Sequence, residues 1–481
     1  MAQPETRRNS PLSKASREDL PAAHQSNIET EVKGMFKPSR LVLLAIAAFM
    51  VFGLSFVACG GNEDEGGGGG GGGAGAWPTP VPGAGVGETI GVTDTSVKIG
   101  TLLPMSNTTA TAWGVPLAAG MKAEFDYIND NGGIYGRKID FVVGDSQYAG
   151  PAASEAVRKL VEQDGVFAIQ GTVGIEAEMA VMTYLQEKGI PDMFLQAAES
   201  TVVNPISYQR YRWLVDYKTE GRILGKYIAE TYPGKKVGII AQNDLFGKAG
   251  EEGLKLGFED AGATMESTTQ YYDATVTDVT AQVQRLKADG AEVIGAYTQP
   301  AQAASAITAA RTTLSWDVPF LLTGVNAAEI MGALSGYDNI KDAVTVSFGP
   351  QSSQTEYPGV VQFRDRMKKY QPDAQINSVA FSGYGVAEAM VEVLILTGPD
   401  LTRTNFLKAA ETICKLDNGA VISPKSLSPT DHDWNESEVF VKATGTGADF
   451  KWVPFGNVIS YESTKDCTPP TYPADADKQP R

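Results

Sequence analysis

A long alternation of short apolar runs with stretches of helical periodicity starts near Thr95 and limits the folds that this chain can adopt. Residues 97–103 read VKIGTLL, a run short and apolar enough to predict a buried strand. Apolar residues then recur at helical spacing over 117–128, and residues 138–145 predict the next strand. Strands separated by helices of this length predict parallel βαβ units, and therefore an α/β fold.

The same alternation continues along the body of the chain and then restarts. Further strands are predicted at residues 166–171, 192–196, 236–242, 264–272, 292–297, 319–323 and 343–348. Further helices are predicted at residues 175–188, 246–261, 276–289, 302–311, 357–370 and 379–396. The C-terminal part of the body predicts antiparallel strands that close it. A single sheet would need about ten strands, so two doubly wound, Rossmann-like α/β lobes fit the pattern better.

An apolar run of 18 residues spans positions 41–58, and Cys59 follows it directly. One interpretation is a membrane-anchoring helix, since about 20 apolar residues span a bilayer. The string FVACG also resembles the lipobox of bacterial lipoproteins, in which the cysteine is lipidated and becomes the first residue of the mature protein. We therefore predict that residues 1–58 are an N-terminal extension with a lipoprotein signal peptide and that Cys59 carries the lipid. Because Met35 opens an ordinary n-region, we expect translation to start there rather than at Met1.

Residues 59–94 predict a flexible tether, which contains eight consecutive glycines at positions 66–73. Gly-rich chain has little stiffness, so about 35 residues give an r.m.s. reach of roughly 30 Å. A body on such a tether can drift over a membrane and meet a membrane partner.

The composition excludes several classes of function. The chain has 40 Lys and Arg against 57 Asp and Glu, a formal charge of −17, which argues against nucleic acid as a partner. Two histidines and three cysteines leave too few ligands for a His-rich or Cys-rich zinc site or an iron–sulfur cluster. The sequence also lacks G-x-S-x-G, H-E-x-x-H and P-loop motifs, so we expect neither a metal nor a cofactor, and an exported enzyme is a remote alternative.

Cys414 and Cys467 are the two cysteines of the body. An exported compartment is oxidising, which predicts a disulfide between them, although two free buried thiols are the alternative. A bridge that closes a loop of about 54 residues stabilises the fold by roughly 4 kcal/mol in the chain-entropy description.

Several strings taken together carry a family resemblance: VKIGTLLPMS, NGGIYGRKIDFVVGDSQ, PAASEAVRKLVEQDGVFAIQGTVG and SPTDHDW. They resemble the branched-chain amino-acid-binding family of ABC-importer solute-binding proteins, which have the type I periplasmic binding fold. The resemblance implies two lobes that are joined by three hinge crossings and close over a small solute. It implies a first lobe of residues 95–216 plus 349–412, a second lobe of 217–348 plus 413–462, and a C-terminal tail of 463–481.

Ligands of doubly wound sheets bind outside the carboxyl ends of the strands, and the loops there are rich in hydroxyls, amides and single aromatics. The resemblance implies that Trp113 lies against the ligand. It implies that Thr172, Val173 and Gly174, before a helix, hold a ligand carboxylate at the helix N-terminus. It implies that a carbonyl of Ala197 or Ala198 binds a ligand amine.

Glu199 departs from the family, which commonly has a hydroxyl residue at this position. A carboxylate facing the cleft would favour a cationic group, whereas the alternative is an outward, solvated side chain. Aromatic, hinge and loop positions of the family correspond here to Asp216, Tyr217, Phe246, Tyr297, Gln299 and Tyr384.

Amino-acid-binding members have a carboxylate after the strand that corresponds to residues 319–323. Here Gly324 and Asn326 are nearest, and the closest acid is Glu329. Because no acid aligns with that position, an amide, a urea-like solute and an amine are alternatives to an amino acid.

The leading hypothesis is an extracytoplasmic, membrane-tethered and monomeric receptor that delivers a small solute to an ABC permease. The alternative is a sensor of the same fold that is coupled to a membrane signalling protein. The tether and the cleft would look the same in both.

Overall fold

The computed structural model describes residues 88–108, 110–204, 206–461 and 466–481. The predicted signal peptide, the lipidation site Cys59 and most of the 59–94 tether lie outside these residues.

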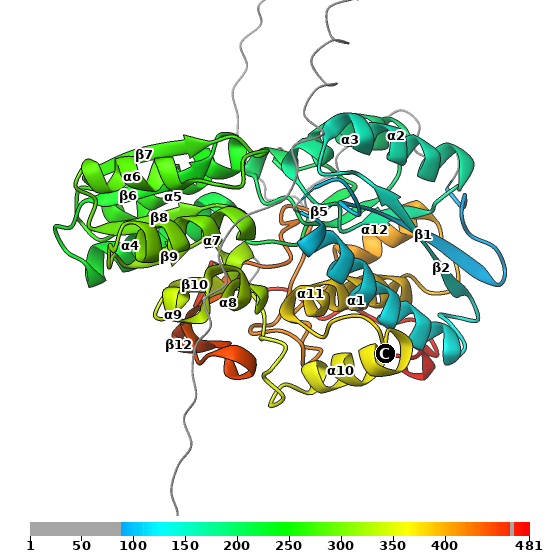
Figure 1. The fold of residues 1–481 in the computed structure, drawn as a ribbon. Coiled ribbons are helices and arrows are strands. Elements are labelled where there is room, and N and C mark those ends of the chain that lie inside the picture. The colour runs from blue at the N-terminus through cyan, green and yellow to red at the C-terminus, as the bar shows by residue number, and fades with distance from the viewer. Residues whose placement is uncertain (1–87, 109, 205, 462–465) are drawn as a thin grey trace, which may run out of the picture. The chain divides into compact units, whose positions relative to one another are not determined.

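The body contains two sheets, each the centre of one α/β lobe (Figure 1). The first sheet has five strands in the order β2-β1-β3-β4-β5, and all of its pairs are parallel. Its strands are β1 (Ser96–Leu103), β2 (Lys138–Asp145), β3 (Ala168–Gln170), β4 (Asp192–Leu195) and β5 (Arg210–Arg212). This arrangement is the doubly wound sheet that the alternation predicts.

The second sheet has seven strands in the order β12-β11-β10-β9-β8-β6-β7. Only the β10–β11 and β11–β12 pairs are antiparallel, as predicted for the C-terminal strands. Its strands are β6 (Val237–Gln242), β7 (Ser267–Tyr272), β8 (Val293–Tyr297), β9 (Phe320–Leu322), β10 (Val344–Ser347), β11 (Ser437–Thr444) and β12 (Lys451–Ser460).

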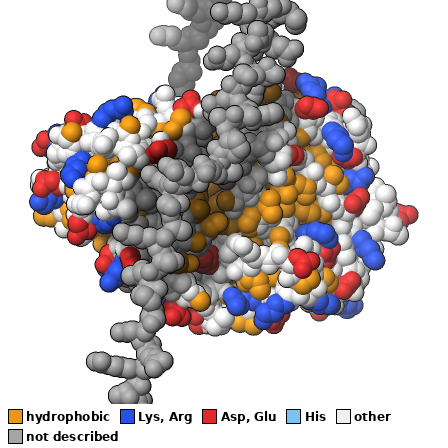
Figure 2. Space-filling model, viewed as in Figure 1, with side chains coloured by type: hydrophobic (Ala, Val, Ile, Leu, Met, Phe, Trp, Pro, Cys, Tyr) orange, Lys and Arg blue, Asp and Glu red, His pale blue; other side chains and the backbone are white. Residues whose placement is uncertain are grey.

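Helices cover both faces of each sheet. In Figure 1, α2 and α3 lie on one side of the first sheet, and α1 and α11 on the other. The first lobe has α1 (Thr111–Asp130), α2 (Gly150–Arg158), α3 (Ile175–Glu187), α10 (Pro358–Tyr370), α11 (Ser378–Thr397) and α12 (Arg403–Ala410). The second has α4 (Tyr217–Thr231), α5 (Leu245–Asp260), α6 (Thr280–Ala288), α7 (Pro300–Thr308), α8 (Ile330–Ser335) and α9 (Tyr337–Ile340). On this face charges of both signs are interspersed, and hydrophobic side chains gather near α1 (Figure 2).

Strand β6 shows why both faces need helices. All six of its residues are buried, as expected for a central parallel strand. Successive side chains point to opposite faces, so Ile239 joins the apolar cluster of α4 and α5, while Ile240 joins that of α6 and α7. Glycines at positions 225 and 257 let α4 and α5 approach closely, because a Cβ at either position would overlap the facing backbone.

Helix α11 is a core helix. Among the described residues it is the one helix long and apolar enough to cross a membrane, but 89% of its apolar window is buried inside the protein.

The chain passes between the lobes three times, at residues 213–216, 348–357 and 434–436. The two-lobed α/β fold with three crossings is therefore confirmed. The prediction grouped residues 413–462 with the second lobe. In the structure β11 and β12 join the seven-stranded sheet, whereas the segment before them runs beside β5, where the backbone N–H of Arg212 donates to the carbonyl of His432.

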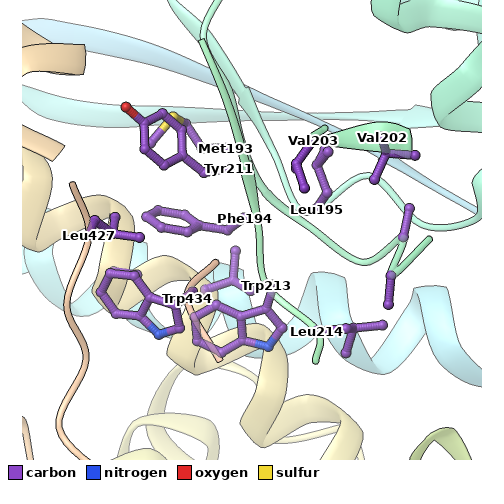
Figure 3. Packing of buried hydrophobic residues seen from close by; sticks show 14 of the residues in the cluster. Met193, Phe194, Leu195, Val202, Val203, Tyr211, Trp213, Leu214, Leu427 and Trp434 are labelled. Atoms are coloured by element: carbon purple, nitrogen blue, oxygen red, sulfur yellow. The ribbon is translucent and has the colours of Figure 1, made fainter. Parts of the chain in front are cut away.

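Aromatic rings bind that segment to the first lobe (Figure 3). Phe194 packs edge-on against Trp434 with ring centroids 5.0 Å apart, and Trp213 stacks on Trp434 at 5.8 Å. The predicted disulfide between Cys414 and Cys467 is present and joins the segment to the C-terminal tail.

Candidate functional site

A pocket lies where the carboxyl ends of the two sheets face each other, and we call it the cleft pocket. Its volume is about 60 Å³. The first lobe, the first crossing and the first residue of α4 supply Ala110, Trp113, Tyr148, Val173, Gly174, Ile175, Glu176, Ala177, Gln196, Leu214 and Tyr217. The second lobe supplies Gln242, Asp244, Phe246, Ala274, Gln299 and Val325.

The N-terminus of α3 forms one end of the cleft pocket. Gly174 is its N-cap, so no side chain caps the first turn. The backbone N–H groups there can donate hydrogen bonds to an anion or to a carbonyl oxygen. Gly174 has φ 102°, and a Cβ on it would lie 2.7 Å from the ring of Tyr148. Only glycine meets both demands, since the position needs a left-handed backbone and leaves no room for a side chain.

A chain of hydrogen bonds forms the opposite, second-lobe wall. The backbone N–H of Gln299 donates to the hydroxyl of Tyr272 at 3.3 Å, and that hydroxyl donates to Gln242 Oε1 at 3.4 Å. Gln242 Nε2 in turn donates to Asp244 Oδ2. Asp244 also caps α5, because its Oδ1 accepts from the backbone N–H of Gly247. The wall therefore presents a fixed carboxylate to the pocket.

One hydrogen bond joins the two lobes across the cleft pocket. Gln299 Nε2 of the second lobe donates to the hydroxyl of Tyr148 of the first at 3.1 Å. Burial first, and the carboxylate of Asp244 second, raise the pKa of Tyr148 far above its ordinary value, so this hydroxyl stays protonated at neutral pH.

Six of the predicted ligand residues line the cleft pocket. They are Trp113, Val173, Gly174, Tyr217, Phe246 and Gln299. Phe246 packs against Tyr217 with ring centroids 4.6 Å apart, so the hinge and the second lobe share one aromatic wall.

The other predicted residues of the first lobe do not line the pocket. Thr172, Ala197 and Ala198 are fully buried behind it. The carbonyl of Ala198 accepts a hydrogen bond from the backbone N–H of Tyr217 at 2.9 Å, so it holds the first crossing in place. The side chain of Glu199 turns back on its own segment, where Oε2 accepts from the backbone N–H of Thr201 at 2.8 Å.

Asp216 and Tyr297 were also predicted as ligand residues, but both make contacts outside the cleft pocket. Asp216 caps α4 and forms an ion pair of 2.7 Å with Arg212. The ring of Tyr297 is buried beneath the cleft-pocket residue Phe246, at a centroid distance of 5.9 Å.

Tyr384 lies in the interior of the first lobe, away from the cleft pocket. Its hydroxyl accepts from Arg366 Nη1 at 2.8 Å and donates to Glu388 Oε1 at 2.7 Å. The guanidinium of Arg366 also pairs with Glu124. Burial raises the pKa of Glu124 to about 7 and that of Glu388 to about 8.

Sequence reasoning missed Tyr148, Gln196, Gln242 and Asp244. Gln242 is the last residue of β6, and the other three lie in loops that follow strands, so position at a strand end is the signal that could have found them. No acid directly follows β9, but Asp244, which follows β6, brings a carboxylate to the cleft pocket. Glu329 is not available for that role, since its carboxylate accepts from Ser352 Oγ and from the backbone N–H and Oγ of Ser378.

Two α/β lobes, three crossings and a polar pocket between the strand ends define a two-lobed binding protein. The chain belongs to the periplasmic binding protein family, whose sequence profile matches residues 96–448. This is a family of binding proteins rather than enzymes, and membership implies an extracytoplasmic location.

Curated relatives are distant. The chain is 23% identical over 198 residues to Leu/Ile/Val-binding protein homolog 1 of Brucella abortus, which covers 41% of this chain and 53% of the relative. It is 24% identical over 200 residues to the leucine-, isoleucine-, valine-, threonine- and alanine-binding protein of Pseudomonas aeruginosa, covering 41% and 52%. The chain thus spans about half the length of the curated relatives it matches.

Solved structures share the fold over most of the body. A branched-chain amino-acid ABC transporter protein from Thermus thermophilus, with bound valine, has a TM-score of 0.68 at 17% identity, covering 77% of this chain and 97% of that one. A fatty acid ABC transporter substrate-binding protein from Thermomonospora curvata has a TM-score of 0.69 at 21% identity, covering 79% and 96%.

Proposed function

We propose that this protein is the solute-binding component of an ABC importer and captures a small polar solute of the amino-acid or amide class in the cleft pocket. The observation that carries the proposal is the polarity of the two ends of the pocket. The N-terminus of α3 offers N–H donors from the first lobe, and Asp244 offers a carboxylate from the second. A solute with a carboxylate or carbonyl oxygen at one end and an N–H group at the other satisfies both.

The walls between these ends support the same class of solute. Trp113 and Phe246 supply apolar surface, whereas Gln196, Gln242 and Gln299 supply hydrogen-bonding groups. An amide, a urea-like solute or an amine can use the same Asp244 carboxylate.

The hydrogen bond between Gln299 and Tyr148 supports capture by closure, because it forms only when the two lobes meet. A solute that touches both lobes binds this form better and shifts the population toward it. The permease would then receive the closed, loaded form. We include in the proposal the lipid anchor at Cys59 and the 59–94 tether, which would keep the receptor beside that permease.

A thermal-shift screen of the lipid-free protein from residue 60 onward tests the proposal. Amino acids, carboxamides, ureas and amines are compared, and one class should raise the melting temperature in a saturable way. The Asp244→Asn variant serves as the matched control, since it should lose the response to solutes that carry an N–H cation. No stabilisation by any member of the four classes would contradict the proposed solute class.

A further inference from the structure

A second cavity, also of about 60 Å³, lies at the hinge, and we call it the hinge pocket. All three crossings contribute to its wall: Trp213 from the first, Phe348 and its neighbours from the second, and Trp434 with Asn435 from the third. The N-terminal part of α11 completes it. Trp113 is the one residue that lines both this pocket and the cleft pocket. Any occupant of the hinge pocket therefore touches the segments that connect the lobes.

The chemistry of the hinge pocket differs from that of the cleft pocket. Five aromatic residues line it, namely Trp113, Trp213, Phe348, Phe381 and Trp434. None of the described residues in its lining is charged, whereas the lining of the cleft pocket includes Glu176 and Asp244. Flat apolar walls without a counter-ion favour a neutral, planar molecule, because a charged one would lose its hydration without compensation.

Most polar groups around the hinge pocket are already satisfied by the protein. Asn435 Nδ2 donates to the carbonyl of Trp213 at 2.7 Å, and Ser347 Oγ donates to the carbonyl of Gly349 at 2.8 Å. Trp434 is the exception: it is 1% exposed, and its Nε1 has no hydrogen-bond partner among the described residues. A buried N–H group without an acceptor is destabilising, which makes this atom a ready donor to an occupant of the pocket.

A second donor lies on the same side. Trp213 Nε1 donates to Ser382 Oγ at 3.1 Å, and this leaves the hydroxyl proton of Ser382 free to point at an acceptor. The indole nitrogens of Trp213 and Trp434 both lie on the side of the rings away from Phe194 (Figure 3). The two donors thus belong to one region of the pocket wall.

We infer that the hinge pocket is a second ligand site, for a small, neutral, planar molecule with one hydrogen-bond acceptor that receives the N–H of Trp434. This site is separate from the proposed capture of a solute in the cleft pocket. Because its occupant contacts all three crossings, binding there is linked to the arrangement of the lobes.

The test uses acetophenone as the probe, since it is neutral and planar and carries one carbonyl acceptor. Binding to the protein from residue 60 onward is measured by isothermal titration calorimetry. Ethylbenzene, which lacks the acceptor, and benzoate, which is charged, are the matched comparison compounds. We expect acetophenone to bind at least tenfold more tightly than either one.

Two variants localise the binding. Trp434→Phe keeps a ring and removes the N–H, and Ser382→Ala removes the second donor, the hydroxyl, at little change in volume. We expect each to weaken acetophenone binding about fivefold or more, and Asp244→Asn in the cleft pocket to leave it unchanged. No binding of acetophenone, equal binding of ethylbenzene, or affinity unchanged in both variants would overturn the inference. If Trp434→Phe fails to fold, the Ser382→Ala result decides alone.

Discussion

The hydrogen bond across the cleft pocket gives the sharpest prediction, through the substitution Tyr148→Phe. The change removes the hydroxyl that accepts from Gln299 Nε2 at 3.1 Å and keeps the ring that packs on Gly174. A neutral hydrogen bond contributes about 0.5–1.5 kcal/mol net. Because the bond joins the two lobes, its loss destabilises the closed form and leaves the free energy of the open form unchanged.

A loss of about 1 kcal/mol corresponds to roughly a fivefold change in the equilibrium between open and closed forms. The affinity for a cleft solute should fall by a similar factor, since only the closed form makes contacts from both lobes. Spin labels are attached to Val143→Cys and Val276→Cys, one exposed position on each lobe. Pulsed electron paramagnetic resonance then measures the distance between the two lobes. The fraction of short distances should fall in Tyr148→Phe.

Tyr184→Phe is the matched control, because its hydroxyl donates to Glu162 at 2.9 Å within the first lobe. This variant should leave the distribution of distances unchanged. If Tyr148→Phe shifts nothing, or if Tyr184→Phe shifts the distribution equally, the bond across the cleft pocket does not stabilise the closed form.

Three further predictions concern charge and covalent structure. Asp244→Asn should weaken the binding of solutes with a cationic N–H group by tenfold or more in calorimetry, since a charged hydrogen bond contributes about 1.5–3 kcal/mol. Asp273→Asn, at an exposed turn, should leave that affinity unchanged. Replacing Cys414 and Cys467 with serine should lower the free energy of unfolding in urea by up to about 4 kcal/mol, and a value near zero would refute the role of the bridge. Because burial raises the pKa of Glu388 from 4.5 to about 8, the folded state binds more protons than the unfolded state, and the free energy of unfolding should fall as pH rises from about 5 to 8. Glu388→Gln should flatten that slope, and an unchanged slope would reject the assignment.

Sequence periodicity predicted most of the fold because each βαβ unit has a hydrophobic pattern that can be read within its own short stretch of sequence. The strand and helix alternation, the antiparallel closing strands and the disulfide all appear in the structure. Local patterns say less about irregular chain. The segment that carries His432 and Trp434 has no periodicity of its own, and it is held beside β5 by backbone hydrogen bonds and stacked rings.

Prediction of which residues line the cleft pocket succeeded where position along the chain decides the outcome, and their role in ligand binding stays a prediction. Val173, Gly174 and Gln299 follow strands directly, so the ends of the sheets bring them together. It did not work where a side-chain direction decides. Tyr148 reaches the cleft pocket through a left-handed backbone with φ 57°, and Glu199 turns away because its carboxylate accepts from the adjacent turn.

The same limit applies inside helices. Tyr384 bonds to Glu388 one turn further along α11, as residues four apart on a helix can, whereas it meets Arg366 only because α11 packs against α10 in the first lobe. Nothing in the spacing of apolar residues along one helix specifies which neighbour a single tyrosine meets.

Capture of a solute between the lobes is tested by a crystal structure of the protein with the solute that stabilises it most in the thermal-shift screen. We expect the solute between Trp113 and Phe246, with one oxygen at the N–H groups of the first turn of α3 and an N–H group toward Asp244. A solute bound outside the cleft pocket, or one that contacts a single lobe, would contradict capture by closure.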